Sequence, residues 1–139
     1  MACCRAASRF AVVSLSWIYR DQGRFADAAS LAEHALKVTE RDLGGEHPAA
    51  IASMVDLADI YAKQERYAEA EALATRAIVI LDKVPELDHS DRLRALEMLI
   101  EICTALEKTD EASAYSDRVK SLIEKMQRTA AGPDAIPQA

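Results

Sequence analysis

Apolar side chains recur along the chain at the spacing of amphipathic helices. One stripe comprises Ile51, Met54, Leu57, Ala58 and Tyr61, and the next comprises Tyr67, Ala70, Leu73, Ala74, Ala77 and Leu81. Steps of three and four residues place such side chains on one face of an α-helix. Residues 63–66, between the stripes, are polar and predict a turn. The pattern therefore predicts two antiparallel helices joined as a hairpin.

This hairpin pattern occurs three times, with a period of 42 residues. Aligned columns include Leu15, Leu57 and Leu99, then Ile18, Ile60 and Ile102, then Ala28, Ala70 and Ala112. A fixed period in this range is typical of stacked repeat proteins, because one unit cannot bury its apolar face alone. The alanine column predicts the closest approach of the paired helices, where a larger side chain would separate the backbones.

The repeats resemble a known family. The second copy reads IYAKQERYAEAEALATRAI after DLGGEHPAAIASMVDLA, and it closely resembles tetratricopeptide repeats of the 42-residue, kinesin-light-chain-like subtype. The resemblance covers roughly residues 9–126 and is weakest in the third copy, where Cys103 and Thr109 replace expected aromatics. It implies an all-α α-solenoid of three helix-turn-helix hairpins, with six to seven helices in a right-handed superhelical stack. We expect the third copy to pack loosely or to act as a cap.

The chain length and the repeat boundaries predict one domain. We place it at residues 1–128, with repeats at about 9–50, 51–92 and 93–128, followed by a disordered tail over 129–139 that carries Pro and Gly. Within the hairpin turns, Gly23 can take the left-handed conformation that ends a helix, whereas Glu65 and Glu107 occupy the same column without glycine's freedom. Pro48, with His47 before it, predicts a helix start.

Composition and charge narrow the function. The 139 residues are 50% hydrophobic and 29% charged, which is ordinary for a globular protein, and the net charge of −6 argues against nucleic-acid binding. No apolar run approaches the ~20 residues that span a bilayer, so we expect no membrane segment. Cys3, Cys4 and Cys103 form neither a disulfide framework nor a metal-binding spacing. We therefore expect a cytoplasmic protein, although Arg5 and Arg9 before an apolar segment also weakly resemble a targeting peptide.

The sequence holds no residues arranged for catalysis. Glu86 and His89 match one half of a di-iron carboxylate motif, but Pro85 places them in a turn and no second copy exists. Cys103 occupies a buried column, where a thiol behaves as a small hydrophobe. We therefore expect no enzyme activity, no cofactor and no metal.

The predicted function is a non-enzymatic protein-protein interaction module, acting as a scaffold or adaptor. In a stack of hairpins the first helix of each unit lines the concave surface, and helical phase selects the residues that face it. The predicted groove comprises Phe10, Val13, Trp17, Arg20, Val55, Asp56, Asp59, Lys63, Glu97 and Glu101. Because this surface runs from aromatic to acidic, we expect a protein or peptide partner with apolar and basic character.

Several groove residues have a second interpretation. Trp17 is either a binding hot spot or a cover for an exposed end of the core. Asp59 and Lys63 are spaced for a helical ion pair, and Arg94 is placed to neutralise Glu97 from one turn earlier.

Two other functions stay open. The last helix carries an apolar stripe with no helix predicted after it, which favours a homo-oligomer. That stripe comprises Tyr115, Val119, Leu122, Ile123 and Met126. Alternatively, the repeats resemble arrays that follow a nucleotide-binding domain, as a sensor segment of a larger signalling ATPase or transcriptional regulator.

Overall fold

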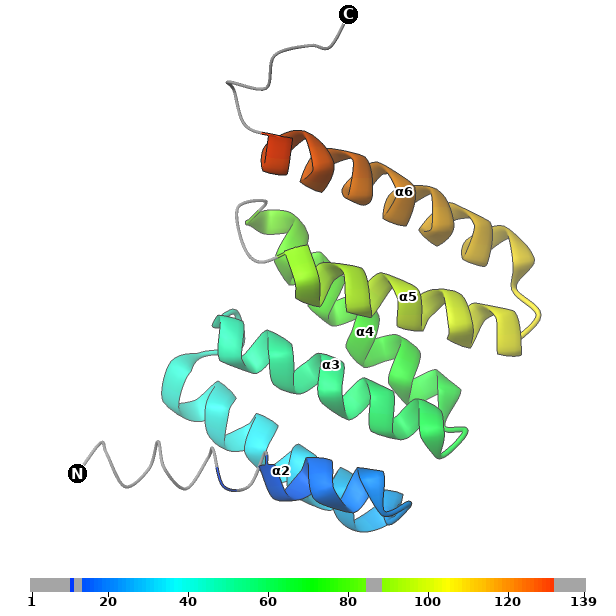
Figure 1. Ribbon diagram of the computed structural model, residues 1–139. Coiled ribbons are helices and arrows are strands. Elements are labelled where there is room, and N and C mark those ends of the chain that lie inside the picture. Colours follow the sequence, from blue (N-terminus) through cyan, green and yellow to red (C-terminus); the bar gives the residue numbers. More distant parts are fainter. Residues whose placement is uncertain (1–10, 12–13, 85–88, 132–139) are drawn as a thin grey trace, which may run out of the picture.

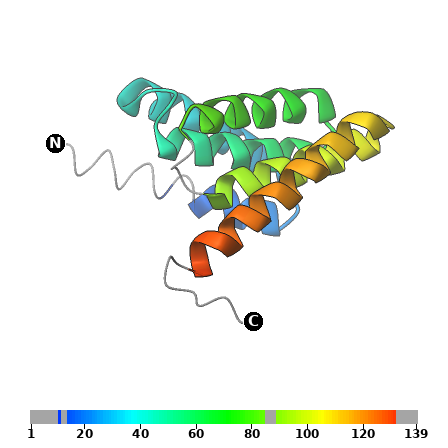
Figure 2. The same ribbon diagram turned by 90° about the horizontal axis from the view of Figure 1, so that it is seen from above.

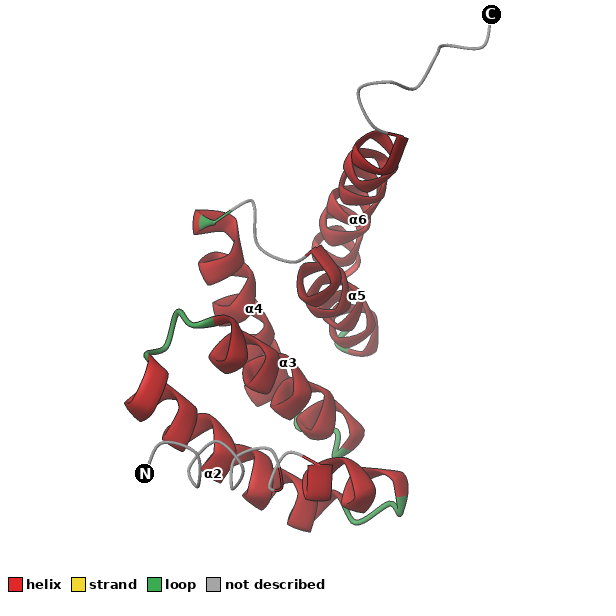
Figure 3. Ribbon diagram, turned by 60° about the vertical axis from the view of Figure 1, so that its left-hand side comes forward, coloured by secondary structure: helices red, strands yellow, loops and turns green. Residues whose placement is uncertain are grey.

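The structure, a computed structural model, describes residues 11, 14–84 and 89–131. Residues 14–21 are helical. The helices that follow are α2 (Phe25–Leu43), α3 (Pro48–Lys63), α4 (Tyr67–Lys83), α5 (His89–Ala105) and α6 (Thr109–Ala131). The described residues contain no strand, and short loops join the helices wherever the connection is described, as between α2 and α3 and between α5 and α6 (Figure 3). The all-α prediction is therefore confirmed.

The helices form hairpins that stack in chain order (Figure 1). Within hairpins, α3 packs on α4 and α5 packs on α6; between hairpins, α2 packs on α3 and α4 on α5. The first helices α3 and α5 also touch directly. Seen from above, α6 crosses the direction of α4, because successive hairpins are rotated (Figure 2). This arrangement is the expected helical repeat stack.

Small residues lie where helices approach most closely. Ala28, Ala58 and Ala70 are fully buried in one continuous core. A methyl group in these columns lets two backbones come to the 8–10 Å separation of packed helices. The third hairpin is not loosely packed at its first helix, because Ile102 and Cys103 are also fully buried. Of the two expectations for the third copy, the structure therefore favours a cap over a loosely packed repeat.

The three hairpin turns share one backbone geometry. Gly23, Glu65 and Glu107 all have positive φ, at 76°, 60° and 59°. The closing hydrogen bonds run from Arg24 N to Tyr19 O (2.8 Å), from Arg66 N to Tyr61 O (2.9 Å) and from Lys108 N to Cys103 O (2.8 Å). Such bonds satisfy carbonyls at a helix end and require one left-handed residue. Two glutamates therefore occupy a conformation that favours glycine.

Helix starts and ends agree with the local sequence except at the tail. The Nδ1 atom of His47 accepts a hydrogen bond from the Ala49 amide at 3.1 Å, and Pro48 opens α3, as predicted. Residues 129–131 belong to α6, so the predicted tail begins inside a helix. The remainder of that tail, 132–139, lies outside the described residues. None of the described helices combines the length and apolar composition needed to cross a membrane.

Candidate interaction surface

The first helices of the hairpins present one polar face, which we call the first-helix face. It carries Trp17 and Arg20 from residues 14–21, Asp56 and Asp59 from α3, and Arg94 and Glu101 from α5. Arg20 Nη1 donates to Asp59 Oδ2 at 3.0 Å, and the same guanidinium lies 5.4 Å from the centre of the Trp17 ring. The indole is nonetheless 45% exposed. One arginine thus positions an accessible tryptophan and joins the first two hairpins.

A second ion pair continues this face toward α5. Arg94 Nη2 donates to Asp56 Oδ1 at 2.9 Å, and Arg94 also lies 3.7 Å from Asp91. The Asp56 side chain is only 13% exposed. The predicted neighbours were wrong in both cases: Asp59 pairs with Arg20 rather than Lys63, and Arg94 pairs with Asp56 rather than Glu97. Both aspartates therefore already have cationic partners within the chain.

Glu101 is the acidic residue on this face that has no such partner. It shares a column with Trp17 and Asp59, is exposed, and makes no ion pair with another described residue. Lys63 is exposed as well. The accessible groups therefore include the Trp17 indole at one end of the first-helix face, the Glu101 carboxylate at the other, and the Lys63 ammonium of α3.

Two predicted groove residues lie elsewhere. Val55 is fully buried, so it cannot contact a partner. Its equivalent in the last hairpin, Glu97, is exposed, which indicates that this column faces the following hairpin. For Val55, which lies on α3, the first helix of the following hairpin is α5, and α5 contacts α3 directly. Phe10 and Val13 lie outside the described residues.

The apolar stripe of the last helix is not a free surface. Tyr115, Val119 and Met126 pack on the core, and Leu122 is 6% exposed. The stripe meets α5 of its own hairpin, because every second helix of the array uses this side to pair with its first helix. Only Ile123 of the predicted set is substantially exposed, at 39%. The prediction that this stripe forms an open face for self-association was therefore wrong.

A second series of ion pairs, which the sequence reasoning missed, links the second helices of successive hairpins. Arg76 Nη2 lies 2.8 Å from Glu40 Oε1, and Arg118 donates to both Asp82 oxygens at 3.0 and 2.8 Å. The two arginines are 42 residues apart, and so are the two acids. These ion pairs could therefore have been predicted from the sequence, because a base and an acid each recur after one 42-residue period.

A partly buried hydrogen bond also joins the first two hairpins. The Tyr61 hydroxyl donates to Glu33 Oε1 at 2.6 Å, and the Arg66 guanidinium lies 4.1 Å from the Tyr61 ring centre. Burial, and then the bond to the Glu33 carboxylate, raise the pKa of Tyr61 to about 12. The phenol therefore keeps its proton at any physiological pH and remains a donor.

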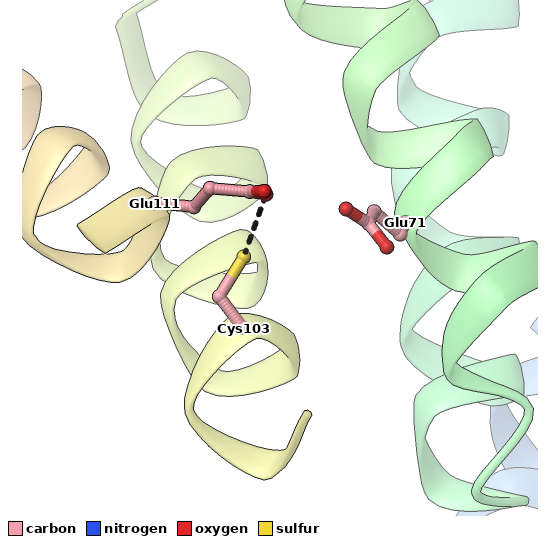
Figure 4. A group of neighbouring side chains, drawn as sticks. All are labelled: Glu71, Cys103 and Glu111. Atoms are coloured by element: carbon pink, nitrogen blue, oxygen red, sulfur yellow. Dashed lines mark hydrogen bonds between the residues drawn. The ribbon is translucent and has the colours of Figure 1, made fainter. Parts of the chain in front are cut away.

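A cluster of possible metal ligands lies at the next hairpin junction. Glu71, Cys103 and Glu111 place their ligand atoms within 4.8 Å of one another (Figure 4). Lys108 Nζ, however, binds both Glu71 oxygens at 2.9 and 3.0 Å and lies 3.8 Å from Glu111. Burial, with the nearby carboxylates, raises the pKa of the Cys103 thiol. The ammonium already supplies the cation that these carboxylates require, so the cluster is a structural junction.

A cleft of about 210 Å³ lies between α4, α5 and α6. Its lining includes Arg92, Arg118, Lys125 and Asp82. Arg92 is nine-tenths buried and donates to the Leu81 carbonyl, while Arg118 is held by Asp82. The two arginines thus stabilise the end of α4 and the junction with α6.

The sequence profile of the tetratricopeptide repeat family matches residues 15–83. The hairpins, the left-handed turns and the 42-residue columns extend that match over the described chain. The chain is a tetratricopeptide-repeat protein. Repeats of this family generally mediate protein–protein interactions. No curated protein matches the chain in sequence.

Solved structures of longer chains resemble this one. The kinesin-light-chain-like protein of Podosopora anserina, with nearly identical TPR-like repeats, is 25% identical over 88% of this chain, with a TM-score of 0.74, and a variant of that protein with one substitution gives 0.75. BtubC (BKLC) from P. vanneervenii is 20% identical over 94% of the chain, with a TM-score of 0.82, and shares the fold. The present chain spans 51 to 58% of those chains.

Proposed function

We propose that this tetratricopeptide array is a non-enzymatic adaptor whose first-helix face is a groove for a segment of a partner protein. The observation that carries the proposal is Trp17, which is 45% exposed although Arg20 holds one side of it. A rigid, accessible indole is typical of binding hot spots, because little side-chain entropy is lost when a partner covers it. Its repeat equivalents, Asp59 and Glu101, are acidic, so core packing does not require tryptophan in this column.

The partner's chemistry follows from the groups that remain unpaired. Arg20 and Arg94 neutralise Asp59 and Asp56, which leaves Glu101 to attract a base. Trp17 and Glu101 are two hairpins apart, and packed helices are about 8–10 Å apart, so the two side chains lie about 20 Å from each other. An extended chain rises about 3.3 Å per residue, so the partner carries an apolar side chain and a Lys or Arg about six residues apart.

The array also belongs in the cytoplasm in this proposal. Cys103 is a free, buried thiol, and its Sγ atom lies 3.9 Å from Glu111 Oε2. Unpaired cysteines are usual in reducing compartments. A reducing environment therefore supports the placement.

Selection from a displayed library of random peptides tests the proposed groove. The recovered peptides should share an aromatic or aliphatic residue and a base at about the spacing given above. Their binding should weaken in the Trp17→Ala and Glu101→Lys variants and persist in Glu124→Lys. That control makes the same charge reversal on an exposed position of α6.

Variants of Asp59 are unsuitable for this test, because they would break the pair with Arg20. Each variant should first show the helicity of the parent chain by circular dichroism. Equal binding by Glu101→Lys and Glu124→Lys would remove the first-helix face as the site. Acidic consensus peptides would contradict the proposed partner chemistry.

A further inference from the structure

Two apolar columns are buried in every hairpin except the first. Along one column, Leu57 and Leu99 are 3% and 0% exposed, whereas Leu15 is 39% exposed. Along the other, Ile60 and Ile102 are 1% and 0% exposed, whereas Ile18 is 51% exposed. The exposed pair lies one turn apart on the helix of residues 14–21. The first hairpin therefore exposes aliphatic surface that its two equivalents bury.

The covering element is the second helix of the preceding hairpin. α2 packs on α3, and α4 packs on α5. In Figure 1 the helix of residues 14–21 and α2 form the lowest hairpin, and no described helix lies beyond it. The columns of Leu15 and Ile18 thus point to the side from which a preceding helix would pack. This end face is distinct from the first-helix face.

The opposite end of the array carries polar residues in the corresponding columns. Leu36 and Ile78 are 6% and 3% exposed, but their equivalent in α6 is Lys120, whose side chain is 71% exposed. Val55, which is fully buried, is matched by the exposed Glu97. Terminal units of repeat proteins need such a polar outer side. The last described hairpin therefore presents polar residues in these columns, whereas the first presents aliphatic ones.

Head-to-tail stacking of two copies does not fit these ends. It would set Lys120 of one copy, whose ammonium lies 3.6 Å from Asp117, against Leu15 and Ile18 of the other. Burying that exposed ion pair against aliphatic side chains would be costly. Head-to-head pairing is also a poor fit. It would place two such faces together, and residues 1–20 contain no acid that could bond the hydroxyl of Tyr19.

Tyr19 adds a polar requirement to the end face. Its equivalent, Tyr61, donates to Glu33 on the preceding helix at 2.6 Å. Arg24 lies 4.3 Å from the Tyr19 ring centre, much as Arg66 lies 4.1 Å from that of Tyr61. The Tyr19 hydroxyl makes no hydrogen bond with a described residue. Tyr19 and Arg24 of the first hairpin are therefore arranged like Tyr61 and Arg66 of the second, but no carboxylate of a described residue accepts the hydrogen bond of the Tyr19 hydroxyl.

We propose that Leu15, Ile18 and Tyr19 form a docking face for an amphipathic helix of a partner protein. The chain itself shows the chemistry of that helix, because α2 covers the equivalent face of α3. α2 supplies small residues, one large aliphatic residue and one glutamate on that side: Ala29, Ala32, Leu36 and Glu33. A partner helix with this pattern would bury the aliphatic pair and accept the hydrogen bond from Tyr19.

A helical peptide copied from α2, residues 25–43, is the probe for this face. A hydrocarbon staple between positions 30 and 34, both exposed in α2, would hold it helical without covering the docking side. Fluorescence anisotropy of the labelled peptide should show saturable binding to the full chain. Ile18→Asp should weaken that binding by at least about tenfold, the effect of losing about 1.4 kcal/mol.

Two variants make this result specific. Ile123→Asp, a matched change at an exposed isoleucine of α6, should leave peptide binding unchanged, and so should Glu101→Lys on the first-helix face. Ile18→Asn provides a milder change if Ile18→Asp loses helicity. If the peptide does not bind, or if Ile18→Asp and Ile123→Asp weaken its binding equally, the docking face would be overturned. The groove proposal would be unaffected by either result.

The predicted hydrogen bond has its own test. Tyr19→Phe should weaken binding of the peptide that carries Glu33 and should have no effect on a peptide with Glu33→Gln, because the cycle isolates the pair. Equal effects on both peptides would contradict the proposed bond. Sedimentation of the full chain completes the test. A dimer that Ile18→Asp dissociates would identify a second copy as the occupant and overturn the partner helix.

Discussion

Replacing Glu65 by glycine should stabilise the array, because the structure holds this glutamate in a left-handed conformation. Its φ of 60° is close to the ideal left-handed value, and the turn needs it to place the Arg66 amide on the Tyr61 carbonyl. A Cβ in this conformation costs roughly 1–2 kcal/mol. The exposed Glu65 side chain makes no hydrogen bond or ion pair with another described residue, so its removal loses no contact.

The net gain is smaller than the strain, because glycine also loses more chain entropy on folding. That loss is about 0.4–1 kcal/mol, so the expected net stabilisation is about 0.5–1 kcal/mol. For a chain of this length the melting temperature should rise by roughly 2–3 °C. Glu107→Gly, at the equivalent turn with φ of 59°, should give a similar increment that adds to the first, because the two turns are far apart.

Thermal and urea unfolding followed by circular dichroism would measure these changes. Glu65→Ala is the matched control: it removes the carboxylate but keeps the Cβ, so it should give little of the gain. Gly23→Ala should lower stability, because it introduces a Cβ at a φ of 76°. A Glu65→Gly variant no more stable than Glu65→Ala would refute the claim that backbone conformation, rather than charge, limits this turn.

Three further predictions follow from the core. Ala70→Leu should destabilise the fold by about 1–3 kcal/mol in urea unfolding, because this fully buried position has no room. Ultraviolet titration should show one tyrosine that ionises near pH 12, and this titration step should be absent in Tyr61→Phe. The stability that protonated Tyr61 contributes to the fold should be complete below pH 10 and lost toward pH 12. With Cys3 and Cys4 replaced by serine, Cys103 should resist iodoacetamide until the chain unfolds, because burial raises its pKa.

The columns of the repeat were predictable from the sequence. A 42-residue period, apolar stripes with helical spacing and one alanine column determine which residues pair within a hairpin. The left-handed conformation was predicted for Gly23, and the structure shows it at the aligned Glu65 and Glu107 as well. These inferences succeed because each depends only on the local helix period and on equivalence between copies.

The neighbour that each helix face meets was harder to predict. Helical phase gives the direction of a side chain but not the neighbour on that side, so Val55 was assigned to the groove although the next hairpin buries it. In the same way, the Leu122 stripe was assigned to another copy, whereas α5 of the same hairpin covers it. Asp59 was paired within its own helix, because the offset between stacked hairpins that brings Arg20 to it is a tertiary property.

The most direct test of the account is the affinity of a library-selected peptide for three forms of the chain. We predict that Glu101→Lys and Trp17→Ala weaken binding by about tenfold or more, the scale of a hot-spot contact, while Glu124→Lys binds like the parent. That result would support the first-helix face as the recognition surface of this array. Unchanged affinity in both first-helix variants, with intact helicity, would contradict it.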